Sequence, residues 1–168
     1  MQIKLTQGRY ATVDDTDFEW LNKWRWSYAK NGYAVRHEQK SEYGENPRRM
    51  IKMHRLIMKV PKDIYLDHIN GNRLDNRRSN LRIATNSQNQ ANALVNSKNT
   101  SGYKGVCLYN LDKPFNVQKP WGARITVMGK KIFKGMFATK EEAAKAYNEL
   151  AKKYHGEYAR LNMIGGGV

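Results

Sequence analysis

The stretch LDHINGNRLDNRRSNLRIATNSQNQAN, residues 66–92, decides how this sequence is interpreted. It contains few apolar residues and many Asn, Arg and Asp, which is poor material for a self-sufficient hydrophobic core. A specific network of polar side chains or a bound ion must therefore organise it. Asp67 and His68 stand side by side near its start, and residues 69–72 supply a turn directly after them.

The Asp67-His68 pair has the chemistry that phosphodiester hydrolysis needs. That reaction requires an activated water and a cation that stabilises charge on the phosphate. Asp67 offers a hard oxygen ligand for Mg²⁺ or Mn²⁺, and His68 can accept a proton near neutral pH. Neighbours on a strand point to opposite sides, so the pair can share one site only where the strand gives way to a loop. Taken alone, the pair is also compatible with a loop histidine beside an Asx turn.

The charge of the chain indicates a polyanionic partner. Its 168 residues carry a formal net charge of +15, and such a surplus points to nucleic acid or to an anionic membrane. We expect no membrane partner, because no stretch approaches the roughly 18 apolar residues of a spanning helix and the N-terminus lacks a signal-peptide core. The single cysteine, Cys107, excludes an internal disulfide. The sequence therefore predicts an intracellular protein that acts on nucleic acid.

The positive charge is concentrated in two stretches, which predicts two separate basic faces. Residues 48–98 contain eleven Lys or Arg and three acidic residues, whereas residues 104–134 contain seven and one. Between them lies NSKNTSG, residues 96–102, a polar stretch of small residues that is typical of a linker. We therefore predict two domains, 1–98 and 99–168.

The N-terminal part is rich in aromatic residues. We expect short strands around one helix, which Asp14 or Asp15 caps and which carries Phe18, Leu21 and Trp24. The aromatic residues are expected to form a small core, with base stacking by one of them as the alternative. They are Trp20, Trp24, Trp26, Tyr28 and Tyr33.

The C-terminal part predicts a three-stranded antiparallel sheet that one helix covers on one face. The strands are YKGVCLYN, WGARITVM and KKIFKGMFA, and Met128-Gly129-Lys130 joins the last two as a tight hairpin. Thr139 and Glu142 fit a capping box at the start of the helix. The apolar stripe of the helix consists of Ala143, Tyr147, Leu150, Ala151 and Tyr154. The helix is neutral and the strands are basic, so the uncovered face of the sheet should contact DNA.

Residues 66–92 resemble the HNH family of nucleases, whose ββα-metal motif places two short strands and a helix around one divalent ion. The resemblance implies that Asp67 is a metal ligand and that His68 is the general base. Asn80 matches the central Asn that positions the loop, and Asn89 matches the final metal ligand on the helix. The family usually has a histidine at the position of Asn89, and the replacement is similar to the homing branch encoded by phages and introns. An amide oxygen suits zinc less well than a hard cation, so we expect one Mg²⁺ or Mn²⁺ as the cofactor.

Further basic residues are expected to contact DNA. His54 and Arg55, in MHRLI, match a His-Arg element found upstream of the motif in homing relatives. His54 is expected to pack or to contact a phosphate rather than to act in catalysis. Four arginines are expected to clamp phosphates, with simple solvation as the alternative for some of them. They are Arg73, Arg77, Arg78 and Arg82.

The motifs SGYKGV, WGARI, GKKIFKGMF, TKEEAAKAY and ARLN occur in that order near the end of the chain. They resemble the APETALA2/ethylene-responsive-factor DNA-binding domain, which lays a three-stranded sheet in the major groove and backs it with a helix. The resemblance places seven residues on the contacting face: Lys104, Cys107, Tyr109, Arg124, Thr126, Lys131 and Phe133. Cys107, Tyr109 and Thr126 stand where arginines are usual, and Arg124 replaces an acid. The resemblance therefore implies the fold but no inherited base preference.

Together these features predict an α+β protein with an HNH nuclease lobe, whose core spans about residues 50–95, and a sheet-plus-helix DNA-binding lobe. It would cut duplex DNA in the cytoplasm or nucleoid of a phage-infected bacterial host, with no obligate protein partner evident. One active site per chain would nick one strand, unless dimerisation or successive nicking cuts both. The first alternative is a non-catalytic DNA-binding regulator that retains an HNH fold. The second is an RNA-binding or RNA-cleaving protein.

Overall fold

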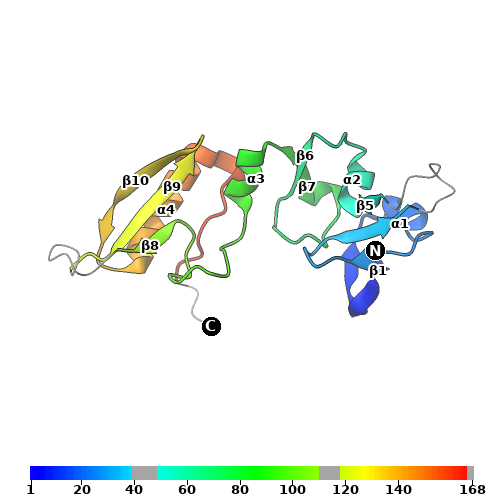
Figure 1. The fold of residues 1–168 in the computed structure, drawn as a ribbon, viewed down its shortest axis with the longest axis horizontal. Coiled ribbons are helices and arrows are strands. Elements are labelled where there is room, and N and C mark those ends of the chain that lie inside the picture. Colours follow the sequence, from blue (N-terminus) through cyan, green and yellow to red (C-terminus); the bar gives the residue numbers. More distant parts are fainter. Residues whose placement is uncertain (39–48, 110–117, 166–168) are drawn as a thin grey trace. The chain divides into compact units, whose positions relative to one another are not determined.

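The computed structural model describes residues 1–38, 49–109 and 118–165 (Figure 1). The chain forms two compact units, Met1–Thr85 and Asn86–Val168. Both units combine helices with antiparallel β-sheets, so the α+β class predicted from the sequence is confirmed. Within the described ranges, no helix has the length and apolar character needed to cross a membrane.

The first unit is built from short elements. Its strands are β1 (Gln2–Lys4), β2 (Tyr10–Thr12), β3 (Ser27–Tyr28), β4 (Ala34–His37), β5 (Met50–Lys52), β6 (Tyr65–His68) and β7 (Leu81–Ala84). Its helices are α1 (Asp15–Leu21) and α2 (Met53–Met58), with 3-10 turns η1 (Thr6–Gly8) and η2 (Arg78–Asn80). The strands pair antiparallel in three small sheets, in the orders β1-β2, β3-β4-β5 and β6-β7.

An apolar core connects these small sheets to the helices. Ile3 of β1, Leu21 of α1, and Met53 and Ile57 of α2 are fully buried in it. Trp26 is also buried, and its indole Nε1 donates a hydrogen bond of 2.9 Å to the carbonyl oxygen of Leu21. This part of the chain therefore has an aromatic residue in its core, as the sequence indicates.

The helix α1 is shorter than predicted. It begins after Asp14 and ends at Leu21, so Trp24 lies beyond its end. The Trp24 side chain is 36% exposed, and the guanidinium carbon of Arg36 lies 3.9 Å from the centroid of its ring. A cation–π contact, rather than helical packing, therefore holds Trp24.

The second unit consists of one sheet and two α-helices among its described residues. Its elements are α3 (Asn86–Asn92), β8 (Val106–Leu108), β9 (Trp121–Val127), β10 (Lys130–Phe137), α4 (Lys140–His155) and the 3-10 turn η4 (Gly156–Tyr158). The antiparallel strands lie in the order β10-β9-β8. Met128 and Gly129 join β9 to β10 with φ angles of 48° and 78°, and two successive positive φ angles suit the twist of a two-residue hairpin. The predicted three-stranded sheet and its hairpin are thus present.

The helix α4 covers one face of this sheet. It starts with the predicted capping box, in which the Thr139 hydroxyl accepts from Glu142 N and the Glu142 carboxylate accepts from Thr139 N. Ala143, Tyr147 and Leu150 are buried against the strands. Tyr154, predicted as part of the same apolar stripe, is exposed instead, and the Lys153 ammonium lies 5.3 Å from its ring centroid.

The boundary between the two compact units lies between Thr85 and Asn86, whereas the sequence predicts a boundary after residue 98. The helix α3 belongs to the second unit, where Lys104 and Arg160 bind its C-terminal end. The Lys104 ammonium donates to the carbonyl oxygens of Gln90, Ala91 and Ala93, at distances of 3.1, 2.6 and 2.7 Å. These oxygens lie at and just beyond the C-terminal end of α3, where carbonyl groups lack helical partners and a cation is favourable.

The stretch predicted as a linker, residues 96–102, is ordered by hydrogen bonds within the second unit. Ser101 is buried, and its hydroxyl oxygen lies 3.0 Å from Asn99 Oδ1 and from the carbonyl oxygens of Tyr103 and Val106. Gly102 N donates to Asn99 Oδ1 at 2.7 Å. Small polar residues here form a compact turn that leads into β8, so their composition indicates turn formation rather than a flexible connection.

Candidate active site

Asp67 and His68 occupy the end of strand β6. The antiparallel register places Asp67 opposite Arg82 and His68 opposite Leu81 of β7. Both side chains are buried, with exposed fractions of 5% for Asp67 and 4% for His68. The strand ends at His68, and Gly71 N donates back to the His68 carbonyl oxygen at 2.8 Å. The pair therefore stands where the strand gives way to a loop, as the sequence predicts.

Asn80 holds the loop that follows. Its Nδ2 donates to Asn70 Oδ1 at 3.0 Å and to the Asp75 carbonyl oxygen at 2.8 Å. Its Oδ1 accepts from Asn70 N at 3.0 Å. One buried amide thereby joins Asn70 and Asp75 of the loop to its end at Asn80.

A second polar layer supports Asn80. Asp75 Oδ2 accepts from Asn70 Nδ2 at 2.8 Å, and the Arg77 guanidinium binds both Asp75 oxygens at 2.8 and 2.7 Å. The hydrogen bonds from the Arg77 side chain lower the pKa of Asp75, and burial opposes this shift. The loop is thus fixed by amide and carboxylate side chains, which is the polar network expected for a segment with so few apolar residues.

The orientation of His68 comes from Asn76. His68 Nε2 lies 3.3 Å from Asn76 Oδ1, and Asn76 Nδ2 donates to the Leu74 carbonyl oxygen at 3.2 Å, which fixes the amide with its oxygen toward His68. An amide oxygen only accepts, so Nε2 carries the proton and Nδ1 carries the lone pair. Burial lowers the pKa of His68 more than the Asn76 hydrogen bond raises it. The imidazole is therefore neutral at neutral pH, in the form that can accept a proton.

Asn76, which contacts His68, was not predicted from the sequence. It is 1% exposed and is among the largest fully buried side chains of the molecule. Nothing in the local sequence separates it from Asn70 or Asn72 in the same loop, because all three are turn formers. Only the fold shows which of these amides faces the histidine.

His68 is part of a cluster of three rings. The centroid of the His54 ring lies 5.0 Å from that of His68 at an interplanar angle of 75°, and the Tyr33 centroid lies 5.0 Å from His54 and 5.9 Å from His68. The sequence predicts that His54 packs or contacts a phosphate, and its side chain is 5% exposed. Burial, and next the neighbouring His68, lower the pKa of His54 to about 3. Its Nδ1 has no hydrogen-bond partner among the described residues.

Two cations surround this cluster. Lys52 Nζ and the guanidinium carbon of Arg73 each lie 4.9 Å from the Tyr33 ring centroid. The Arg73 Nη1 also donates to the Asn31 carbonyl oxygen at 2.6 Å. Arg73 was predicted to clamp a phosphate, whereas Lys52 and Tyr33 were not predicted. Their positions supply positive charge beside the neutral histidine.

The other predicted phosphate clamps of the first unit bind groups of the protein itself. Arg77 pairs with Asp75, Arg78 pairs with Asp17 and Arg82 pairs with Asp67, with closest distances of 2.7, 2.8 and 2.8 Å. The Arg55 guanidinium donates to the carbonyl oxygens of Ile64 and Pro61. Sequence alone could not show the pairs of Arg78 and Arg82, because their acidic partners come from other elements of the fold. In this structure these arginines hold the fold.

The Asp67 side chain is of the kind that binds hard divalent cations. Asp67 provides a carboxylate, and the Arg82 guanidinium already donates to its Oδ2 from Nε at 3.0 Å and from Nη2 at 2.8 Å. The position thus accommodates positive charge on a buried oxygen ligand. Within residues 1–38, 49–109 and 118–165, no three His, Cys, Asp or Glu side chains are gathered in a way that could hold a metal ion. The resemblance implies a different kind of site, in which the ligands are one carboxylate and one amide.

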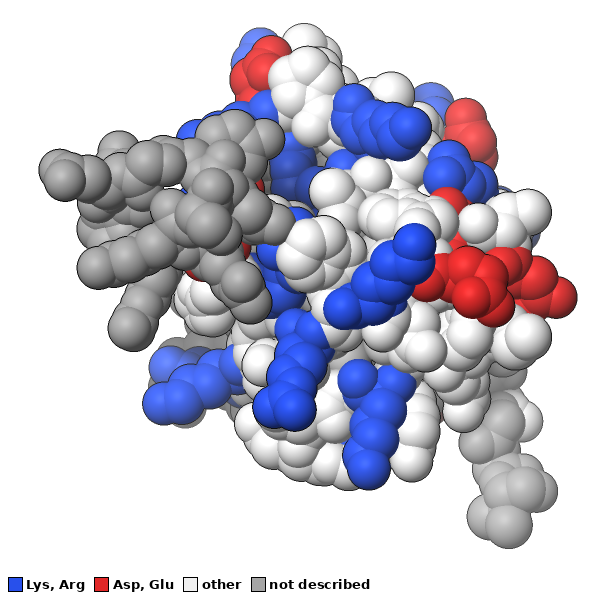
Figure 2. All heavy atoms as spheres, turned by 90° about the vertical axis from the view of Figure 1, so that its right-hand side faces the viewer, with Lys and Arg blue, Asp and Glu red and all other residues white. Residues whose placement is uncertain are grey.

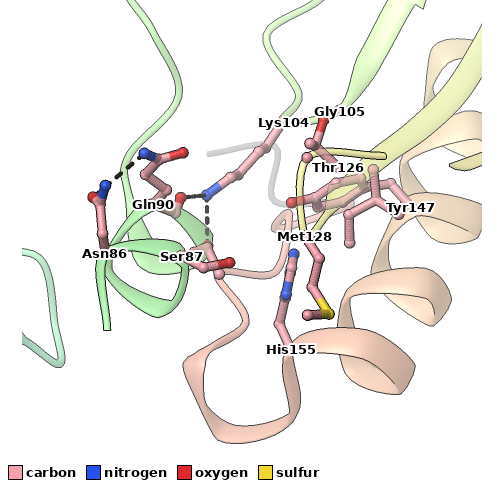
Figure 3. A pocket seen from close by; sticks show the side chains of 12 residues that line it. Asn86, Ser87, Gln90, Lys104, Gly105, Thr126, Met128, Tyr147 and His155 are labelled. Carbon is pink, nitrogen blue, oxygen red and sulfur yellow. Dashed lines mark hydrogen bonds between the residues drawn. The ribbon is translucent and has the colours of Figure 1, made fainter. Parts of the chain in front are cut away.

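Asn89, the second ligand implied by the resemblance, lies on α3 of the second unit. The opposite side of α3 lines a pocket of about 400 Å³. Figure 3 shows Asn86, Ser87 and Gln90 on one side of this pocket and Tyr147 on the other. With 100° between successive helical residues, Asn89 is directed away from this lining.

The uncovered face of the sheet carries most of the other predicted DNA contacts. Arg124 lies opposite Phe133 and Thr126 opposite Lys131, and all four are exposed. The Tyr109 and Phe133 rings meet edge to face with centroids 5.8 Å apart.

Gly122 of β9 makes room for this pair of rings. An added Cβ at Gly122 would come within 2.3 Å of Tyr109 Cε2 and 2.9 Å of Phe133 Cε2, so both rings lie directly over its backbone.

Lys104 is the exception among the predicted DNA contacts, because its ammonium caps α3 instead.

Comparisons with known proteins agree with the motif around this site. The family model of the HNH endonuclease matches residues 52–91. A protein of Acanthamoeba polyphaga mimivirus, named as an uncharacterized HNH endonuclease, is 31% identical over 164 residues, which cover 94% of this chain and 77% of the relative. Protein 3.8 of Escherichia phage T7 is 31% identical over 102 residues, which cover 61% of this chain and 78% of the relative. No solved structure matches the chain. From its matched motif and its likeness to the mimivirus protein along most of both chains, this chain belongs to the HNH endonuclease family.

Proposed function

We propose that this protein is a metal-dependent endonuclease of the homing type that hydrolyses phosphodiester bonds in duplex DNA. The observation that carries the proposal is the buried, neutral His68, which Asn76 orients at the end of the strand that also holds Asp67. A structural histidine would not need a fixed tautomer beside a buried carboxylate, whereas a general base does. Its site of action would be the cytoplasm or nucleoid of a phage-infected bacterium.

In this proposal, His68 Nδ1 accepts a proton from a water molecule. The water oxygen forms a bond to phosphorus while the bond from phosphorus to the departing sugar oxygen breaks. Asp67, with Asn89 as the partner that the resemblance implies, would hold Mg²⁺ or Mn²⁺. The bound ion would supply the positive charge that stabilises the phosphate and the departing oxygen. Lys52 and Arg73, beside Tyr33, add positive charge at the same cluster.

The uncovered face of the second unit's sheet would position the duplex. Its exposed Arg124 and Lys131 supply positive charge, and the Tyr109–Phe133 pair supplies an apolar surface over Gly122 of the same sheet. Arg124 is suited to a base edge in the major groove and Lys131 to a phosphate. With one His68 per chain, a monomer would nick one strand, and cutting of both strands would need a second chain or a second event.

Nicking of supercoiled plasmid, with and without Mg²⁺, tests the proposal. His68→Ala should lower the single-turnover rate by about 10²–10⁴-fold, because a general base acts in the transition state. Duplex affinity measured in EDTA should remain near the wild-type value. His37→Ala is the matched control, since His37 is an exposed histidine of the same unit, and it should leave the rate unchanged.

The outcomes separate the rival functions. Nicking by His68→Ala at the wild-type rate would remove His68 from the mechanism. A wild-type protein that binds duplex DNA but never nicks it with Mg²⁺ or Mn²⁺ would be the non-catalytic regulator. Faster cleavage of matched RNA than of DNA would make it a ribonuclease.

A further inference from the structure

A groove in the first unit lies between β5, α2 and the segment that follows α2. Its volume is about 620 Å³. Five of its eleven lining residues are Lys or Arg, and one is acidic. The cations are Arg49, Lys52, Arg55, Lys59 and Lys62. Figure 2 views the structure from the side of the first unit and shows Lys and Arg side chains spread over that face, with Asp and Glu gathered in a few places. The groove concentrates this surplus in one concave surface.

The cations of the groove differ from the arginines around the loop. Arg77, Arg78 and Arg82 are each paired with a carboxylate. Of the groove cations, Arg55 is bound by two carbonyl oxygens and forms part of the wall. The other four form no ion pair with any residue in the part of the chain that the structure describes: Arg49, Lys52, Lys59 and Lys62. Unneutralised cations in a concave surface attract a polyanion far more strongly than paired ones.

The local backbone keeps these cations at the groove. The helix α2 ends at Met58, and the next residue, Lys59, adopts a left-handed conformation with φ of 50° and ψ of 37°. The chain then turns through Val60 and Pro61 to Lys62, and the Arg55 guanidinium holds this turn by its bond to the Pro61 carbonyl oxygen. The apolar residues Ile51 and Leu56 also line the groove, which suits the sugar as well as the phosphate of a nucleotide.

Lys52 connects the groove to the catalytic cluster. It lines the groove, and its ammonium lies 4.9 Å from the centroid of the Tyr33 ring. That ring lies 5.0 Å from His54, which in turn lies 5.0 Å from His68. A strand whose phosphates follow the groove would therefore be led to the histidine cluster.

We infer that this groove binds the phosphodiester backbone of the DNA on its way to His68. That the bound strand continues to His68 rests on the proposed function, whereas binding of the backbone in the groove does not. The groove cations differ from Arg77, Arg78 and Arg82, whose charges are each paired with a carboxylate.

The test compares two triple variants that lose the same charge from the same unit. The groove variant is Arg49→Gln, Lys59→Gln, Lys62→Gln, which retains Lys52 and Arg55. The control is Lys4→Gln, Lys23→Gln, Lys30→Gln, at three exposed lysines that do not line the groove. Affinity for a short duplex of random sequence is measured in EDTA over a range of salt concentrations. Random sequence suffices because backbone contacts carry no base preference.

The groove variant should bind at least about ten-fold more weakly at low salt. Its slope of log affinity against log salt should fall by roughly 2–3, at about 0.9 for each phosphate that the protein no longer neutralises. The control should keep the wild-type slope. Equal slopes for the two variants would overturn the inference. If the groove variant does not fold, as judged by circular dichroism, Lys62→Gln against Lys23→Gln gives the same comparison with an expected difference of about 0.9.

The plasmid nicking assay on the wild type separates this inference from the proposed function. A slope difference in a protein that never nicks would support the groove and refute the nuclease. Nicking by a protein whose two triple variants bind alike would refute the groove and leave the nuclease standing.

Discussion

The β6–β7 loop of the first unit and the helix–sheet packing of the second unit depend on opposite kinds of interaction. In the first unit, the loop from β6 to β7 depends on side-chain amides and carboxylates, with Asn80 at its centre. In the second unit, α4 packs on the sheet through small apolar residues such as Ala143 and Ala151, together with Leu150. A polar network fixes atoms to within a hydrogen-bond length, whereas an apolar face tolerates small shifts. The site that requires an oriented histidine lies in the unit with the polar network.

Truncating one central side chain in each unit should give the largest effects and tests this difference directly. Asn80→Ala deletes three hydrogen bonds in a buried loop, and we expect a loss of about 3–4 kcal/mol in the free energy of unfolding of the first unit. Leu150→Ala leaves a cavity under α4, and we expect a loss of about 2–3 kcal/mol from the second unit. Hydrogen exchange resolved by peptide measures each unit separately.

The expected pattern is reciprocal. Asn80→Ala should reduce protection in β6 and β7 but not in α4, and Leu150→Ala should do the reverse. Equal loss of protection in both units from either variant would show that the chain unfolds as one cooperative body, and the contrast between the units would fail.

Acid should destabilise the first unit, because this unit contains a buried neutral histidine. The pKa of His54 falls from 6.5 to about 3 on folding, so the unfolded chain binds the proton first as the pH decreases. The first unit should therefore have its full stability above about pH 6.5 and lose up to about 1.4 kcal/mol per pH unit between there and pH 3. Urea unfolding at several pH values, followed by peptide-resolved exchange, measures the slope.

His54→Gln provides the control for this effect. This variant lacks the titrating group. The slope of its free energy of unfolding against pH should therefore be smaller by an amount that corresponds to the uptake of up to one proton. Any slope that remains belongs to other groups, such as His68. If the wild type and His54→Gln lose stability in parallel as the pH falls, the burial of a neutral His54 is not the cause.

The smallest expected effect comes from the cap of α4. Thr139→Ala removes the side chain that accepts from Glu142 N, and loss of such a cap costs about 1 kcal/mol. The loss should appear only in the second unit, as a lower midpoint of urea unfolding. Thr139→Ser keeps the acceptor and should restore most of the stability. Equal losses from Ala and Ser would mean that the hydroxyl does not act as the cap.

The elements of the second unit could be predicted from sequence because their signals are local. The capping box needs only Thr139 and Glu142, and the hairpin needs only Met128 and Gly129. The exposure of Tyr154 was missed because a stripe predicted from spacing alone does not show where the partner surface ends.

The site of the first unit was predictable in its motif but not in its partners. The positions of Asp67 and His68 at a strand end follow from the residues after them. The pairing of Arg82 with Asp67 requires the strand register, and the contact of Asn76 with His68 requires the folded loop. For the same reason the sequence assigned Arg78 to a phosphate, since its acidic partner Asp17 becomes a neighbour only after folding. Asp75 stands two residues before Arg77, but only the folded loop shows that the two side chains pair.

Lys104 limits how this chain can be divided into exchangeable modules. A chimaera joined at residue 98 would leave α3 on one parent and its lysine on the other, so the contacts of the ammonium with three carbonyl oxygens would depend on whatever residue the new partner supplied. A chimaera joined between Thr85 and Asn86 would transfer helix and lysine together. Recombination between relatives should therefore preserve folding more often when the crossover precedes α3 than when it falls in the polar stretch that composition alone would select.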